Sequence, residues 1–348
     1  GLIIIGNGII NRTGSVTLEG TNTSEDNPPQ DYGNGTDNAD DSGRLKYVRI
    51  EFAGYATATD AELNSLTLAA VGSGTEIEYV QTLNGLDDSF EFFGGAVDAK
   101  HLVSYNAGDD HFDMSEGYVG RLQHLIGFQQ IDVGTITRPA AGNESTDPQG
   151  IENDGCQGAN CGAGQNSEPR TVPLVANFTL VGPPGDVNGE TSGTVGMMLR
   201  RGTGGYYVNG LLARWNRAGI SLRDQTTLDR VADESLILRN ILVAETENLF
   251  QTGGSSVQGT VDATANAIEH VAATTATSLF AGLPGEVSTA ALDWTPSAAA
   301  ASRTGGLVTL PGPIATKAGT FMTGTAYRGA ADPNGAKWWQ GWTRYAEN

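Results

Sequence analysis

The sequence is short of positive charge and of long apolar runs. It holds 20 Lys and Arg residues against 40 Asp and Glu residues, a formal net charge of −20. This balance excludes generic nucleic-acid binding, because neutralising phosphates requires Lys and Arg. It also disfavours docking on an anionic membrane surface. No apolar run reaches the roughly 18–20 residues that a membrane-spanning helix needs, so we expect no membrane span.

Cysteine is nearly absent, and so are the common catalytic motifs. The two cysteines, Cys156 and Cys161, are too few for a zinc site without two further ligands. A local disulfide is the favoured interpretation, and a pair of free thiols is the alternative. We find no Gly-x-Ser-x-Gly elbow, no Walker A loop and no His-Glu-x-x-His motif.

Glycine, by contrast, is abundant. The chain has 48 Gly among 348 residues, and only 17% of its residues are charged. This composition favours many short strands with tight turns over a helical bundle. Segments such as "LKYVRIEFAG", "EIEYVQTLNG" and "AKHLVSYNAG" alternate in polarity and close with Gly or Asn, as short strands do. An acidic loop at 19–43 and a cysteine-containing loop at 133–171 interrupt the pattern.

One stretch of the chain recurs as an approximate repeat. "NGLDDSFEFFGG" at 84–95 is echoed 22 residues later by "NAGDDHFDMSEG" at 106–117. A repeat of this length predicts a solenoid, and the leucine-rich pattern is missing. We therefore predict an all-β parallel β-helix, whose successive coils lie about 4.8 Å apart. Phe90 and Phe112 should then form an internal core stack, and Asn84 and Asn106 a corner ladder.

The repeat also brings acids together. We expect Asp87, Asp88 and Glu91 of one coil to lie near their counterparts in the next coil, which are Asp109, Asp110 and Asp113. At about 5 Å, like charges repel by roughly 3 kcal/mol at an effective dielectric of about 20. A Ca²⁺ ion, which takes six to eight oxygen ligands, would offset this repulsion. The alternative is that the aspartates cap backbone N–H groups at the corners.

Catalysis is a third interpretation of the same acids. "GDDH" at 108–111 resembles the paired aspartates of polygalacturonases, but the Gly-His-Gly and Arg-x-Lys motifs of those enzymes are missing. Arg200 and Arg201 are the one pair that could serve as the base of a pectate lyase, although salt bridges to acids are the more ordinary role. His101 and His124 could stack as neighbours, and we expect them to serve as packing residues instead of metal ligands.

The predicted β-helix spans residues 1–255. We expect residues 256–348 to hold the final turns, a short helix near 262–275 that begins at Asp262, and a Trp-rich C-terminal cap. Trp338, Trp339 and Trp342 would either cap the open apolar end of the coil or serve as platforms for sugar rings.

Several blocks together resemble a family of secreted bacterial proteins of the Bacteroidetes type. The blocks are "GLIIIGNGIIN", "SGRLKYVRIEFAG", "NSLTLAAVGSGTEIEYVQ", "DDSFEFFGGAVDAKHLVSYNAGDDHFD", "LRRGTGG" and "WWQGWTRY". The resemblance covers most of the chain and implies a right-handed parallel β-helix at the cell surface or outside the cell. It implies no particular activity.

Two functions follow as hypotheses. The first is a non-enzymatic structural or adhesive β-solenoid outside the cell. It would be stabilised by Ca²⁺ and would pair with other copies of itself, through the apolar strand "LIII", into a filament or surface layer. The second is a protein that binds or degrades cell-surface polysaccharide, like a pectate lyase or polygalacturonase, with a row of exposed aromatic residues beside the acids.

Overall fold

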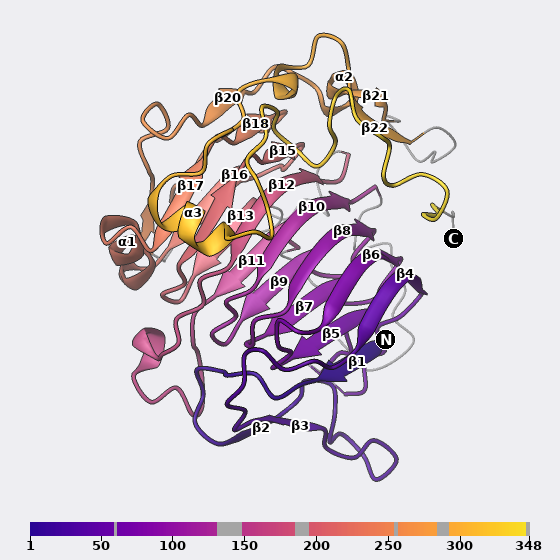
Figure 1. Cartoon of the computed structure of the whole chain (residues 1–348), viewed down its shortest axis with the longest axis vertical. Helices are drawn as coiled ribbons and strands as arrows, with labels where there is room; N and C mark the ends of the chain where they lie inside the picture. The colour runs from indigo at the N-terminus through magenta and orange to yellow at the C-terminus, as the bar shows by residue number, and fades with distance from the viewer. Residues whose placement is uncertain (59–60, 131–147, 185–194, 254–256, 284–291, 346–348) are drawn as a thin grey trace.

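The chain forms a coil that runs alternately through two large sheets, and within each sheet the strands of successive coils lie side by side (Figure 1). The computed structural model describes all residues except 59–60, 131–147, 185–194, 254–256, 284–291 and 346–348. Within each large sheet the neighbouring strands are parallel, apart from the antiparallel pair β16 and β19 at one end. The predicted parallel β-helix is confirmed.

The eight-stranded sheet has the order β1-β5-β7-β9-β11-β13-β16-β19. Its strands are β1 (Leu2–Ile5), β5 (Leu66–Ala69), β7 (Phe90–Phe93), β9 (Phe112–Ser115), β11 (Ile151–Asp154), β13 (Val195–Arg200), β16 (Ala218–Arg223) and β19 (Gln258–Gly259).

The ten-stranded sheet contains five strands of eight residues and five shorter strands. These are β4 (Arg44–Glu51), β6 (Glu76–Leu83), β8 (Asp98–Tyr105), β10 (Arg121–Phe128), β12 (Leu174–Val181), β14 (Gly205–Val208), β15 (Leu211–Ala213), β17 (Leu236–Arg239), β18 (Leu242–Ala244) and β20 (Glu269–Val271). Outside both sheets lie the hairpins β2 (Ser15–Thr17) with β3 (Asp31–Gly33), and β21 (Phe280–Gly282) with β22 (Asp293–Pro296).

The main core fills the space between the two sheets. Phe90 pairs in register with Phe112, and their fully buried rings stack with centroids 5.3 Å apart and planes 10° apart. Phe92 and Met114 repeat this inward arrangement one pleat further along the strands. The residues between them, at positions 91 and 113, consequently point out of the coil.

A bend in the middle of the eight-residue strands, which recurs between β14 and β15 and between β17 and β18, places a row of residues at equivalent positions of successive coils. We call it the bend ladder; its members have φ of 53–62° and are Tyr47, Tyr79, His101, His124, Asn177, Asn209 and Asn240. Such φ values are uncommon for residues other than Gly, Asn and His. The Tyr79 ring stacks on those of Tyr47 and His101 at 4.6 and 4.4 Å, and the His101 ring stacks on that of His124 at 5.1 Å.

The last part of the chain returns along the outside of the ten-stranded sheet (Figure 1, yellow). We call residues 305–345 the C-terminal strap, which includes α3 (Gly312–Ala318). The bend ladder holds it: Asn177 Nδ2 donates to Thr325 Oγ1 at 2.8 Å, and His124 Nδ1 lies 3.1 Å from Ala330 O. Near its end, Arg344 O accepts from Gln81 Nε2 at 2.6 Å, which places the strap beside an early coil.

The prediction that the tryptophans cap the open end of the coil is wrong. Trp339 is 2% exposed, and Trp338 and Trp342 are partly buried against the flank of the ten-stranded sheet. Trp342 meets the Tyr47 and Tyr79 rings edge-on. These rings pack on the apolar outer surface of β6, β8, β10, β12, β15 and β18, because burying this surface removes a large apolar area from water. Buried and edge-packed rings are also unsuited to serve as sugar platforms.

Two local predictions are wrong as well. Residues 262–275 form turns and β20 instead of a helix, and the Asp262 carboxylate accepts the N–H of Ala265, at 3.0 Å, within a turn. The α-helices in the described residues are α1 (Gln225–Ala232), α2 (Ala276–Leu279) and α3, and two short 3-10 helices span Gly164–Asn166 and Ala301–Arg303. The expected loop at 133–171 contains β11, and its residues 133–147 lie outside the described part of the chain. No helix in the described ranges is long and apolar enough to cross a membrane.

Candidate metal centre on the outer face of the eight-stranded sheet

Three neighbouring strands place one carboxylate each on the outer face of the eight-stranded sheet. Glu91 of β7 pairs in register with Asp113 of β9, which pairs in turn with Glu152 of β11. Each acid follows a fully buried apolar residue, so strand alternation alone turns it outward. We call these three residues the acidic row.

Asp88 and Asp110 lie in the turns that precede β7 and β9, and both cap backbone N–H groups. Asp88 Oδ1 accepts the N–H of Asp110 at 2.8 Å, and Asp110 Oδ1 accepts the N–H of Gln149. Corner capping, one of the three roles considered for the repeated aspartates, is therefore present at these two positions. The second oxygen of each carboxylate is not used by these bonds.

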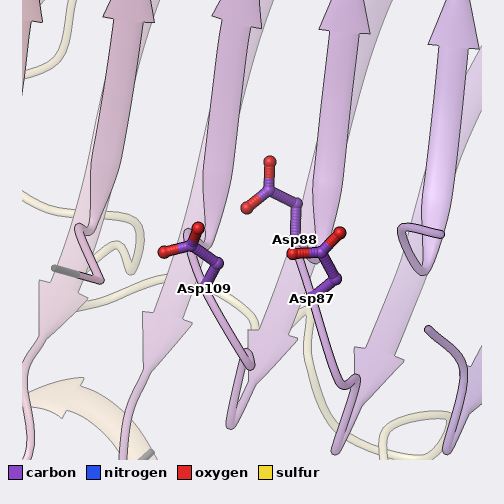
Figure 2. Close-up of side chains that lie close together, drawn as sticks. All are labelled: Asp87, Asp88 and Asp109. Carbon is purple, nitrogen blue, oxygen red and sulfur yellow. The ribbon is translucent and has the colours of Figure 1, made fainter. Parts of the chain in front are cut away.

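The aspartates of the two turns and the carboxylates of the acidic row come close enough to one another to share a cation. Asp87, Asp88 and Asp109 each offer a carboxylate oxygen within 4.8 Å of the others, and Figure 2 shows the three side chains close together on adjacent turns. Two further trios meet the same distance, namely Asp88 with Glu91 and Asp113, and Asp110 with Asp113 and Glu152. The three trios overlap and form one continuous acidic patch.

Burial raises the pKa of these carboxyls, and their neighbours raise it further. Removal from water raises the pKa of Asp88, Glu91, Asp110 and Asp113 well above the usual range, and the surrounding carboxylates add to the effect. The same causes raise the pKa of Glu152 to about 8. Ionising these groups together at neutral pH therefore requires a compensating positive charge.

The protein supplies that charge at only one end of the acidic row. Arg200 Nη2 pairs with Glu152, and its Nε lies 2.9 Å from Asp154 Oδ1, while Arg201 also pairs with Asp154. Within the described ranges, no Lys, Arg or His lies at ion-pair distance from the four aspartate and glutamate carboxyls at 88, 91, 110 and 113. Asp113 Oδ1 is buried and accepts no hydrogen bond.

A cavity of about 210 Å³ opens beside the acidic row. Its lining combines all three row members with their close neighbours Glu116 and Asp154 and with Arg12, Glu19 and Arg201 from other segments of the chain. Glu19 as a whole residue is exposed, but partial removal of its carboxyl group from water, together with the nearby acids, raises its pKa to about 7. Ser115 and Gln157 add neutral polar groups.

This donor set fits a hard divalent cation. All the converging atoms are carboxylate oxygens, which Ca²⁺ and Mg²⁺ prefer, and the flexible geometry of Ca²⁺ suits a site built from three strands and two turns. The trios are less suited to inverting glycoside hydrolysis, in which the two carboxyls stand about 6.5–9.5 Å apart to leave room for water. The 4.8 Å limit within each trio is shorter than that.

Sequence reasoning missed half of this site. Glu152, Glu19, Glu116 and Arg12 were not among the predicted site residues. Glu152, Glu19 and Arg12 come from segments outside the repeat, and Glu116 lies in the second copy at a position where the first copy has Gly94. A signal did exist for Glu152: it follows Ile151 as Asp113 follows Phe112, although the insertion before it hides the 22-residue spacing.

The remaining predicted residues have structural roles. Asn106 Nδ2 donates to Asn84 Oδ1 at 3.0 Å, so the two amides form one step of a corner ladder. Cys156 and Cys161 form the predicted disulfide. Neither pair points to a ligand.

Comparison with known proteins gives the family. The profile described as pectate-lyase-like β-helix domain matches residues 1–295. The chain belongs to this family. No curated protein and no solved structure matches the chain. The family accounts for the parallel coil, and the acidic patch with its cavity has to be interpreted from its own geometry.

Proposed function

We propose that the chain is a non-enzymatic extracellular β-helix protein that binds Ca²⁺ at the acidic patch and uses the ion to stabilise its coil. The observation that carries the proposal is the group of Asp88, Glu91 and Asp113, which share oxygens within 4.8 Å and have no basic partner at ion-pair distance among the described residues. A bound ion would link β7 and β9 across the sheet and offset the repulsion between their carboxylates.

Calcium titration by calorimetry tests this proposal. The wild-type protein should bind Ca²⁺ with a dissociation constant of about 0.1–1 mM or tighter, the usual range for extracellular sites. Glu91→Gln combined with Asp113→Asn keeps the shape of both side chains and should abolish binding. Glu25→Gln, an exposed acid of the 19–43 loop, is the matched control and should bind like the wild type. Equal binding by the double variant would contradict the proposal.

A structural role outside the cell also includes contact with other copies. Leu2 and Ile5 of β1 are 36% and 37% exposed, and Tyr47 and Phe52 at the other terminal strand are 59% and 56% exposed. Outermost strands with apolar side chains are suited to pairing with another chain. Light scattering over increasing protein concentration would detect the assembly, and a constant monomer mass would exclude it.

A second candidate, the processing of an acidic polysaccharide, is favoured by one observation. The cavity places Arg12 and Arg201 beside the acidic row, so that cationic and anionic groups share one hollow. Incubation with polygalacturonate and Ca²⁺ separates the options. Unsaturated products would indicate a lyase, new reducing ends alone would indicate a hydrolase, and an unchanged polymer would leave the structural role.

A further inference from the structure

One wall of the acidic cavity comes from the start of the chain. We call residues 10–33 the N-terminal wall, which includes the β2–β3 hairpin that lies outside both large sheets (Figure 1). Ile10, Leu18 and Tyr32 are buried against Phe93 and neighbouring residues on the outer face of the eight-stranded sheet. This wall contributes Arg12 and Glu19 to the cavity.

An ion pair and a hydrogen bond hold the wall to β9. Arg12 Nε lies 2.8 Å from Glu116 Oε1, and Tyr32 OH donates to Glu116 Oε2 at 2.6 Å. Glu116 follows the last residues of β9 and is 3% exposed. Its two oxygens are thus each engaged by a different part of the wall.

The disulfide loop holds the same wall from the other side. Asn160, which lies between the two cysteines, accepts from Thr13 through its carbonyl, at 2.9 Å from Thr13 N and 3.3 Å from Thr13 Oγ1. Cys156 Sγ lies 3.6 Å from Asn11 O, a packing contact because a disulfide sulfur carries no hydrogen. The loop therefore contacts the residues on both sides of Arg12.

The closed wall also has a local cost. Asn11 is 4% exposed, and neither its side-chain nitrogen nor its side-chain oxygen has a hydrogen-bond partner. A buried amide without partners favours any movement that lets water reach it. The contacts around Arg12 have to offset this preference, and several of them come from the loop that the disulfide closes.

We propose that the Cys156–Cys161 disulfide is a latch that holds the N-terminal wall, and with it Arg12 and Glu19, against the acidic cavity. Reduction by a dithiol breaks the S–S bond: two electrons and two protons convert the cystine into two thiols while the dithiol becomes a disulfide. The 156–161 loop then loses its closure, Asn160 no longer presents a fixed carbonyl to Thr13, and the wall opens.

Hydrogen exchange on the folded protein, with and without dithiothreitol, tests the latch. We expect the Thr13 amide to exchange about tenfold faster or more after reduction, as for a segment that opens locally, while the Asn106 amide inside the coil stays protected. Cys156→Ser with Cys161→Ser should exchange fast at Thr13 in both conditions. Unchanged exchange at Thr13 after complete reduction would overturn the proposal, as would equal acceleration at Asn106.

A calcium titration of the oxidised and reduced proteins adds a second measurement, which rests on the proposed function. The reduced protein should bind Ca²⁺ several-fold more weakly, because Glu19 leaves the cavity. If neither form binds Ca²⁺, the proposed function fails while the exchange result still decides on the latch. If both forms bind equally, Glu19 does not contribute, and the latch does not act on the site.

Discussion

The outer faces of the two sheets differ in how their apolar and charged side chains are covered and paired. On the ten-stranded sheet, the C-terminal strap buries the apolar surface, and several of the charges that remain are paired, as Lys46 is with Glu78 at 2.7 Å. Even the larger hollow there, of about 370 Å³ beside Phe321, has its Lys100 ammonium donating to Phe321 O at 2.5 Å. We call this the covered face.

The outer face of the eight-stranded sheet, which we call the acidic face, differs in its charge balance. Its carboxyls are largely buried, and among the described residues the ion pairs made by the acidic row are those of Glu152. This difference supports the proposal that the acidic face binds an external cation, while the covered face contributes stability.

The largest expected effect is on the covered face. Trp339→Ala should destabilise the protein by about 3–5 kcal/mol, the range for removing a buried aromatic side chain. Trp339→Phe should cost much less, because it keeps most of the ring and removes an indole N–H that has no hydrogen-bond partner. Chemical denaturation measures both variants. A cost below about 1 kcal/mol for the alanine variant would show that the strap is not a stabilising element.

A smaller effect of opposite sign is expected on the acidic face. Without calcium, Asp113→Asn should stabilise the protein by about 1–2 kcal/mol, because it removes one charge from a crowded group, and one pKa unit corresponds to 1.36 kcal/mol. With calcium, the wild type should gain stability and the variant should not. Melting temperatures with and without a chelator give both comparisons, and a destabilised calcium-free variant would contradict the account.

The two faces should respond to pH in opposite directions. On the acidic face, folding raises the pKa of Glu152 from 4.5 to about 8, so the folded state retains protons that the unfolded state has lost, and stability falls as pH rises through this window. On the covered face, burial lowers the pKa of His124 from 6.5 to about 4, so stability falls as pH drops from 6.5.

Calcium-free unfolding measured from pH 4 to 9 separates these contributions. Glu152→Gln should flatten the decline on the alkaline side, and His124→Asn should flatten the decline on the acidic side. A Glu152→Gln variant that still loses stability at high pH like the wild type would place the effect elsewhere.

The smallest expected change is that of His124→Asn at neutral pH. Asn occupies the same bend position at 177, 209 and 240, with φ of 53–57°, and it tolerates this conformation well. The substitution should alter the free energy of unfolding by less than about 1 kcal/mol, whereas His124→Val should cost more, since a branched side chain is strained there. Equal costs for the two variants would show that the bend is not the constraint.

The coil and part of the site could be predicted from the sequence, for a physical reason. Stacked coils require the same residue types at a fixed spacing, so Phe90 with Phe112 and Asn84 with Asn106 were visible as a 22-residue repeat. The strands of the acidic repeat itself, β7 and β9, follow from the alternation of buried rings and outward acids.

The rest depended on contacts that no local pattern records. Arg12 and Glu19 reach the cavity through a hairpin far from the repeat, and the strap returns from the end of the chain to the flank of early coils. The tryptophans were misplaced because their apolar character predicts burial without saying against which surface. The spacing of Tyr79, His101 and His124 could have revealed the bend ladder, since each recurs after 22 or 23 residues.

The most direct test is a crystal structure of the protein with Tb³⁺ in place of Ca²⁺, located by its anomalous scattering. The account predicts one strong peak among the carboxylates of Asp88, Glu91 and Asp113, and no peak on the covered face. An acidic face without a peak, or a peak held only by exposed acids of the 19–43 loop, would contradict it.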